Sequence, residues 1–96
     1  MIRLLIVIYD AGAEEDVAAV LEEAPVQGWT KLFHAFGDGG TGRKMGDPAF
    51  PGSNNVALVA LPEEDVELFR ERLRGVQTLF TKKPGITLFS LPAEVL

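Results

Sequence analysis

Four short apolar runs alternate with two segments of mixed polarity along the chain. The runs cover residues 2–9, 29–36, 56–61 and 86–91, and they are rich in β-branched or aromatic residues. Runs of this length that are bounded by Gly, Pro, Asn or Asp are typical of β-strands. The first run is almost uniformly apolar, which favours a central strand that is covered on both faces, or on one face and by a subunit contact. We therefore expect four strands.

Between these runs, apolar residues recur with the spacing of a helix. Acidic residues at positions 14–16 suit the positive end of a helix dipole, and Pro25 ends the first pattern. A second helix is predicted from Pro62, a favoured first residue, to a stop at Gly75. The residues with helical spacing are Val17, Val20, Leu21 and Ala24 in the first segment, and Val66, Phe69, Leu73 and Val76 in the second.

The order of these elements is β-α-β-β-α-β, which predicts a ferredoxin-like α+β fold in a single domain spanning residues 1–96. Right-handed crossovers bring the four strands into one antiparallel sheet and place both helices on one face. The opposite face is then left open. Because 47% of the residues are hydrophobic, more than a chain of this size usually buries alone, we expect another subunit to cover that face.

The charge balance of the chain is acidic. Nine basic and fourteen acidic residues give a net charge of −5, which argues against nucleic acid and against an anionic membrane surface as partners. The absence of cysteine excludes disulfides and thiolate metal sites. No apolar run approaches the length of a membrane span, and residues 2–9 lack the features of a signal peptide. We expect a cytoplasmic protein without stable membrane insertion.

Residues 37–53 have a different composition, with six of the ten glycines and no helical or strand period. The string Gly-Asp-Gly-Gly-Thr-Gly at 37–42 matches a dinucleotide fingerprint, but the helix that such a site requires is not predicted after it. Successive glycine amides and adjacent bases can still bind an anion. Alternatively, the glycines only permit tight turns and the bases are solvated. The candidate anion-binding residues are Gly37, Gly39, Gly40, Gly42, Arg43 and Lys44.

His34 is the single histidine, near the end of the second predicted strand. With Asp38 and Asp47 it offers one nitrogen and two carboxylates, a donor set for a metal ion across a subunit boundary. The alternative is a sheet residue that makes one hydrogen bond, since a second nitrogen ligand is missing. Both interpretations stay open at this stage.

The sequence offers little support for catalysis. Ser53 and Ser90 lie outside any nucleophile-elbow context, and cysteine is absent. A small ferredoxin-like enzyme would need an enclosed pocket at His34 or Tyr9. We therefore expect a protein that binds and signals and is not an enzyme.

Two groups of residues are given structural interpretations. Acidic pairs such as Glu14 and Glu15 are interpreted as solvated residues that pair with a helix dipole. Trp29, Phe33 and Phe36 are interpreted as core, although aromatic side chains of this kind can also stack on a base.

The order of several short motifs resembles that of the nitrogen-regulatory P-II signalling proteins, and above all their short P-II-like branch. The resemblance covers nearly the full chain, although each motif is short. The motifs are Gln-Gly-Trp-Thr at 27–30, the glycine-rich loop from Gly37 to Arg43, residues 50–55, the strand 56–61, Glu-Asp-Val at 64–66 and Leu-Phe-Ser-Leu-Pro-Ala-Glu at 88–94.

This resemblance implies a homotrimer with inward-facing sheets and with ligand clefts between subunits. It implies that the clefts hold an adenine nucleotide and that the 37–53 loop contacts a partner protein. The residues implied in the cleft are Thr30, Gly37, Gly39 and the loop up to Arg43, with Lys82, Lys83 and the rest of 82–85 closing it from across the boundary. The loop is shorter than in P-II proteins and has no tyrosine, and Thr87 stands where those proteins have a phosphate-binding lysine.

The sequence therefore predicts a P-II-like trimeric regulatory protein that binds a small anionic ligand, with an adenine nucleotide as one candidate. Two alternatives remain on the same fold. One is a metal-binding or metal-tolerance trimer that uses His34, and the other is a small ferredoxin-like enzyme.

Overall fold

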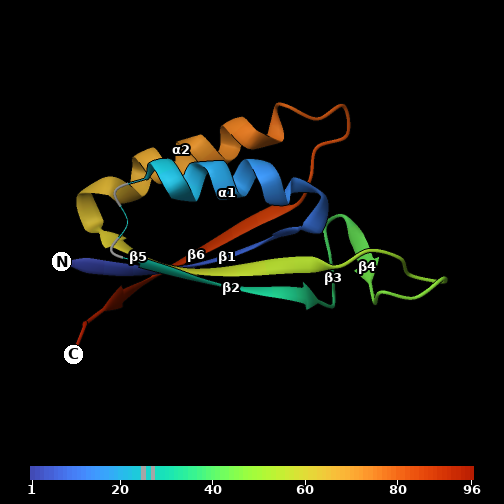
Figure 1. Ribbon diagram of the computed structural model, residues 1–96, viewed down its shortest axis with the longest axis horizontal. Helices are drawn as coiled ribbons and strands as arrows, with labels where there is room; N and C mark the ends of the chain where they lie inside the picture. Colours follow the sequence, from blue (N-terminus) through green and yellow to red (C-terminus); the bar gives the residue numbers. More distant parts are fainter. Residues whose placement is uncertain (25, 27) are drawn as a thin grey trace.

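The computed structural model describes residues 1–24, 26 and 28–96. Strands and helices follow one another in the predicted order (Figure 1). Two residues used in the sequence analysis, Pro25 as the predicted helix stop and Gln27 as the first residue of the 27–30 motif, lie outside the described residues. The elements are β1 (Ile2–Asp10), the 3-10 turn Ala11–Ala13, α1 (Glu14–Glu23), β2 (Gly28–Ala35), β3 (Gly37–Gly39), β4 (Gly42–Lys44), β5 (Asn54–Pro62), the 3-10 turn Glu63–Asp65, α2 (Val66–Gln77) and β6 (Ile86–Ala93).

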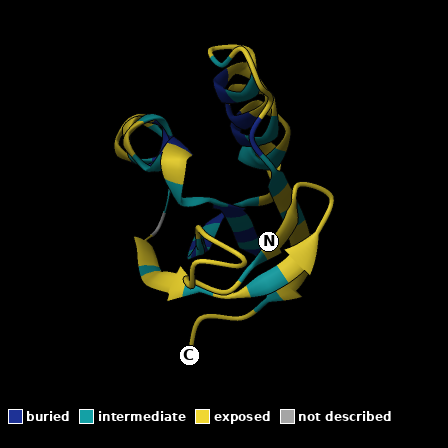
Figure 2. Ribbon diagram, turned by 90° about the vertical axis from the view of Figure 1, so that its right-hand side faces the viewer, coloured by how far each residue is buried: buried dark blue, intermediate teal, exposed yellow. Residues whose placement is uncertain are grey.

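The main sheet is antiparallel, and the described residues give it four strands in the order β2-β5-β1-β6. β1 lies in the interior of the sheet, as its uniformly apolar sequence predicts. Both helices lie on the same face (Figures 1 and 2). The predicted ferredoxin-like α+β fold is therefore confirmed. Within the described chain, neither helix has the length and apolar character needed to cross a membrane.

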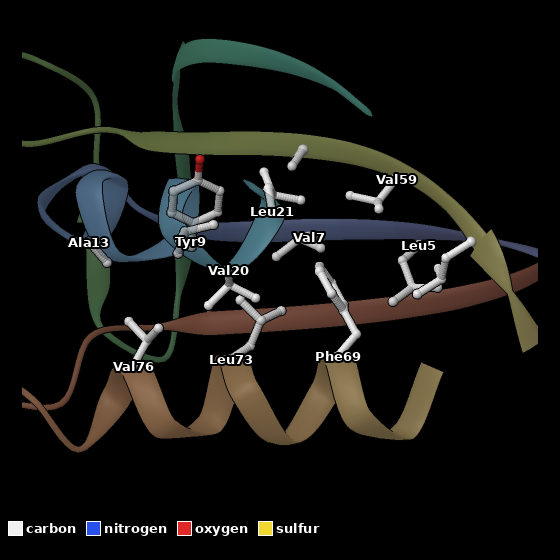
Figure 3. Close-up of a cluster of buried hydrophobic side chains, with 13 residues drawn as sticks. Leu5, Val7, Tyr9, Ala13, Val20, Leu21, Val59, Phe69, Leu73 and Val76 are labelled. Atoms are coloured by element: carbon white, nitrogen blue, oxygen red, sulfur yellow. The ribbon is translucent and has the colours of Figure 1, made fainter. Parts of the chain in front are cut away.

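One apolar layer joins the helices to the sheet (Figure 3). Alternate residues of β1, namely Leu5, Val7 and Tyr9, are each 1% exposed, which is the period expected for a strand with one face on the core. The helices cover them with one stripe each, formed by Val17, Val20 and Leu21 on α1 and by Phe69, Leu73 and Val76 on α2. The sequence periodicity predicted all six helix residues.

The other face of the sheet is apolar and open. Ile6 on β1 lies at its centre, paired with Leu58 on one side and with Phe89 on the other. Leu32, Phe89 and Leu91 are 55%, 54% and 45% exposed. Figure 2 shows both helices on the opposite side of the sheet. A contiguous exposed patch of this kind marks an interaction surface.

Three aromatic residues are wrongly interpreted as core in the sequence analysis. Trp29, Phe33 and Phe36 are 41%, 56% and 57% exposed. They belong to the edge strand β2 and the residue that follows it, and apolar composition alone cannot separate an edge strand from a central one.

The second helix differs from its predicted bounds at both ends. Pro62 is the last residue of β5, and α2 begins at Val66 after a 3-10 turn. Gly75 lies inside α2 and does not stop it, because the next residue, Val76, is 4% exposed and packs in the core. That packing outweighs the cost of about 1 kcal/mol for glycine within a helix.

The last strand also continues beyond its predicted end. β6 includes Pro92, which pairs with Arg3 of β1. β6 is an edge strand, where proline is tolerated because only one side of the strand takes part in the ladder.

The 37–53 segment contains a small hairpin that its sequence does not predict. β3 and β4 pair with each other, and the turn between them uses Gly42 at φ +102°. The rest of the segment folds back on itself, since Met45 N–H donates to the Phe50 carbonyl at 2.9 Å and Gly46 N–H to the Gly52 carbonyl at 3.0 Å. Gly46 and Gly52 also have positive φ, which explains why glycine is suited to these positions. β3 and β4 consist of glycine and charged residues, so they have no hydrophobic alternation to detect.

Candidate functional site

Figure 1 shows the end of the sheet where β1 finishes and the hairpin packs. A cleft of about 580 Å³ lies there. Three segments that are distant in sequence contribute most of its lining: the end of β1, the β3–β4 hairpin, and the connection into β6 with the start of that strand. Residues at the end of β2, the start of β5 and the end of α2 complete it. Its hairpin side is lined by Gly37, Asp38, Gly39, Gly40, Thr41, Gly42 and Lys44, and its opposite side includes Asp10, Lys83, Pro84, Gly85 and Thr87.

Asp10 joins these three segments. Its Oδ1 lies 2.6 Å from Lys44 Nζ and accepts a hydrogen bond from Thr41 Oγ1 at 3.2 Å. Its Oδ2 accepts a hydrogen bond from Gly85 N–H at 2.6 Å, and its own N–H donates to the Gly85 carbonyl at 3.0 Å. Lys44 Nζ also donates to Thr41 Oγ1 at 2.5 Å. One carboxylate therefore holds the hairpin against the β6 connection.

This contact depends on the absence of a side chain at position 85. A Cβ there would lie 3.1 Å from both Cγ2 and Oγ1 of Thr41 and 3.6 Å from Asp10 Oδ2. Glycine therefore permits the hairpin to approach the connection closely.

The Asp10 and Lys44 pair is charged and largely shielded, with side chains 19% and 14% exposed. Burial raises the pKa of Asp10, but the hydrogen bonds from Lys44 and Gly85 N–H outweigh it and hold that pKa below its ordinary value. Asp10 is accordingly ionised at neutral pH, and its charge is matched by that of Lys44.

The structure brings most of the predicted anion-binding residues together. Gly37, Gly39, Gly40, Gly42 and Lys44 all line the cleft. Their partner in the prediction, Arg43, does not line it, because its guanidinium pairs with Asp38 at 3.3 Å and lies over the Phe50 ring at 5.1 Å. Lys44 lies in the cleft already paired to a carboxylate.

The residues implied by the P-II resemblance separate into two groups. Lys83 lines the cleft with the hairpin glycines of the same protomer, although it was expected to reach them from across a subunit boundary. Thr30 and Lys82 do not line this cleft: Thr30 pairs with Leu58 on β5 and belongs to the open sheet face.

Sequence reasoning missed Asp10, which was interpreted only as the residue that ends the first run. A carboxylate at the end of a central strand, followed by a glycine-rich loop later in the chain, is the one signal that could have indicated it. Its partners Thr41 and Gly85 are 31 and 75 residues away, so their contact is set by the fold.

Glu14 is a second residue whose interpretation was wrong, since it is not a solvated helix residue. Its Oε1 accepts hydrogen bonds from Tyr9 Oη at 2.5 Å and from Asn55 Nδ2 at 3.0 Å, and its Oε2 accepts one from Lys31 Nζ at 2.7 Å. Lys31 also lies 4.9 Å from the centre of the Trp29 ring. This cluster ties the start of α1 to β1, β2 and β5.

The pKa directions in this cluster follow from burial and hydrogen bonding. Burial raises the pKa of Glu14, but hydrogen bonds from Lys31, Tyr9 and Asn55 lower it further than burial raises it. Burial and the adjacent Glu14 carboxylate raise the pKa of Tyr9, so its hydroxyl stays protonated and acts as a donor.

The lowered pKa values of Asp10 and Glu14 predict a fold that is sensitive to acid. A carboxylate whose pKa is lower in the folded state stabilises the fold fully above its unfolded pKa, about 4. This stabilisation is lost as the pH falls through the folded pKa. Urea unfolding should therefore give a free energy of unfolding that declines below about pH 4. Glu14→Gln should reduce that decline and Glu15→Gln should not, and equal declines in all three proteins would contradict the assignment.

His34 occupies a strained backbone position at the bulge of β2, with φ +60°. It lines an open pocket of about 360 Å³ together with Asp47. Asp47 uses its Oδ1 to accept a hydrogen bond from Phe50 N–H at 2.8 Å, which fixes the turn of the loop. The described residues contain no group of three or more His, Cys, Asp or Glu side chains placed to hold a metal ion. Metal binding through His34 stays a prediction.

Tyr9 offers no accessible group for catalysis. Its side chain is 1% exposed and its hydroxyl is hydrogen-bonded to Glu14. His34, the other residue named for an enzyme, is exposed and lies in an open pocket and not an enclosed one.

Comparisons with known proteins give matches only at the level of structure. No protein-family model matches the chain, and no curated protein does. CPII, a nitrogen regulatory PII-like protein from Thiomonas intermedia K12 whose structure was solved with ADP, AMP and bicarbonate, is similar with a TM-score of 0.71 and 20% identity. That match covers 94% of this chain and 85% of CPII.

Two further solved structures are similar. A PII-like signalling protein from Thermus thermophilus matches with a TM-score of 0.63 and 13% identity, over 94% of this chain and 86% of its own. A functionally unknown protein from Pediococcus pentosaceus ATCC 25745 matches with a TM-score of 0.67 and 17% identity, over 99% of this chain and 94% of its own. The resemblance first indicated by short motifs is thus confirmed in three dimensions, and the chain has the fold of the PII-like proteins.

Proposed function

We propose that this chain is a PII-like regulatory protein that binds a small anionic ligand, with an adenine nucleotide as the leading candidate, in the cleft between the hairpin and the β6 connection. The observation that carries the proposal is the convergence of four hairpin glycines and Lys83 on one cleft of about 580 Å³. Glycine-rich backbone lets a ligand approach the amides closely, and a lysine supplies the matching charge. Within the described chain, Lys83 forms no ion pair that would occupy it.

The structural neighbours support the choice of ligand. CPII has the same fold and binds ADP together with AMP and bicarbonate or acetate in its solved structures. A cleft of the size found here accommodates a ligand of that class.

The proposal includes assembly into a homotrimer of single-domain protomers in the cytoplasm. The open apolar face of the sheet, centred on Ile6, is the surface that the copies would bury. The 37–53 segment, which carries one side of the cleft, is the part that would report ligand binding to a partner protein.

Calorimetric titration of the protein with ADP, AMP and sodium bicarbonate tests the proposal. Saturable heat with at least one of the two nucleotides is the expected result. The absence of heat with both nucleotides, in a protein that melts cooperatively, would remove adenine nucleotides from the proposal.

Adjacent lysines provide a matched pair of variants for the site. Lys83→Met should weaken binding of ADP about tenfold, because a charge-assisted hydrogen bond is lost. Lys82→Met makes the same chemical change one residue away, outside the cleft of the protomer, and should weaken ADP binding less. Calorimetry on the three proteins measures the difference. A larger loss in Lys82→Met than in Lys83→Met would show that the cleft of one protomer is not the site.

A further inference from the structure

The charges that line the cleft are balanced. In the part of the chain that the structure describes, the lining includes two carboxylates, Asp10 and Asp38, and two ammonium groups, Lys44 and Lys83. A site built for a highly charged polyphosphate would carry an excess of positive charge. One or both of the two carboxylates must therefore offset the attraction of the lysines for a bound anion.

Asp38 is poorly placed to do so. Its side chain is 61% exposed and pairs with Arg43 at 3.3 Å, so water and a guanidinium both screen its charge. Asp10 is different, because its side chain is only 19% exposed and three donors hold it in place: Lys44, Thr41 and the Gly85 N–H. A shielded charge acts over a longer range than a solvated one.

Asp10 also neutralises the cation that the hairpin brings to the cleft. Lys44 Nζ lies 2.6 Å from Asp10 Oδ1 and its side chain is 14% exposed, so an entering anion meets an ion pair and not a free ammonium group. Removing the charge of Asp10 while keeping Lys44 would leave a positive charge that an anion could match.

We propose that Asp10 determines the charge of the ligand that the cleft accepts: it favours anions of low charge, such as bicarbonate or a nucleoside monophosphate, over polyphosphates. The assignment to nucleotides rests on the proposed function, whereas the effect of Asp10 on anion charge does not. Because the Asp10 carboxylate cancels the attraction of Lys44, each further negative charge on the ligand gains nothing from this lysine, and the advantage that a free ammonium group would give along the series AMP, ADP and ATP is lost.

The test is the ratio of the dissociation constant for AMP to that for ATP, measured by calorimetry at low ionic strength. Asp10→Asn should raise this ratio about tenfold relative to the original protein. Glu71→Gln on the outer side of α2 changes the net charge by the same amount and should leave the ratio unchanged. The ratio is informative because general damage to the site weakens the binding of both ligands and leaves their ratio unchanged.

Lys44→Met provides an independent readout if Asp10→Asn does not fold. This variant leaves the Asp10 carboxylate without its positive partner, which should weaken the binding of ATP more than that of AMP. The ratio of the dissociation constant for AMP to that for ATP should therefore fall by a similar factor. An unchanged ratio in either folded variant would overturn the role of Asp10.

Inorganic anions separate this inference from the proposed function. If the original protein binds no nucleotide, the role of Asp10 can still be tested with inorganic anions. The measurement is the rise in melting temperature of Asp10→Asn with sodium pyrophosphate, compared with its rise with sodium bicarbonate. A larger pyrophosphate shift in Asp10→Asn than in the original protein supports the inference although nucleotide binding has failed. Equal shifts overturn the inference, and they do so whether or not nucleotides bind.

Discussion

Replacement of Ile6 by glutamate is expected to convert the proposed trimer to a monomer without unfolding the protomer. Ile6 lies in the middle of the open sheet face, between Leu58 and Phe89. In a trimer that buries this face, the new carboxylate would be taken out of water without a partner, which costs several kcal/mol. In the free protomer the side chain points away from the helices, so the core is not disturbed.

Sedimentation velocity and the thermal transition together measure this effect. Leu68→Glu is the matched control, because it makes a similar change at an exposed apolar residue of α2, 46% exposed, away from the sheet. The Leu68→Glu control should sediment with the same assembly mass as the original protein. An Ile6→Glu protein that sediments as the original oligomer would show that the open face is not the assembly surface.

Replacement of Glu14 by alanine is expected to destabilise the protomer by about 3 kcal/mol. The change removes the common acceptor of Tyr9, Lys31 and Asn55. Tyr9 and Asn55 are 1% and 3% exposed, and the side chain of Lys31 is 9% exposed, so water cannot readily replace the lost carboxylate. A buried ammonium group and two buried donors would remain without their partner.

Urea unfolding followed by circular dichroism gives the difference in the free energy of unfolding. Glu15→Ala removes the same kind of side chain from the next position, which is exposed, and should change stability by less than about 0.5 kcal/mol. If the two variants are equally stable, Glu14 is not the centre of a stabilising cluster.

The hydrophobic pattern was sufficient to predict the architecture because the fold depends on it directly. A uniformly apolar first run belongs in the middle of a sheet, and the period of the helix residues fixes which stripe faces the core. The errors at Pro62 and Gly75 have a different origin. Local signals for helix ends were outweighed by the pairing of β5 with β1 and by the burial of Val76.

The candidate site was predicted only in part. The glycines and bases of the hairpin stand out as a local run in the sequence. Asp10 and Glu14, the two carboxylates that organise this end of the molecule, acquire their roles from partners such as Gly85 and Asn55, which are 75 and 41 residues away. No local pattern distinguishes such a carboxylate from a solvated one.

Native mass spectrometry of the unmodified protein, with and without ADP, tests the central claim most directly, because it reports assembly and ligand number in one spectrum. We expect a species of three times the protomer mass of 10.4 kDa that gains the mass of bound ADP in steps up to three. A protein that remains a monomer and acquires no nucleotide under conditions that preserve its fold would contradict the account.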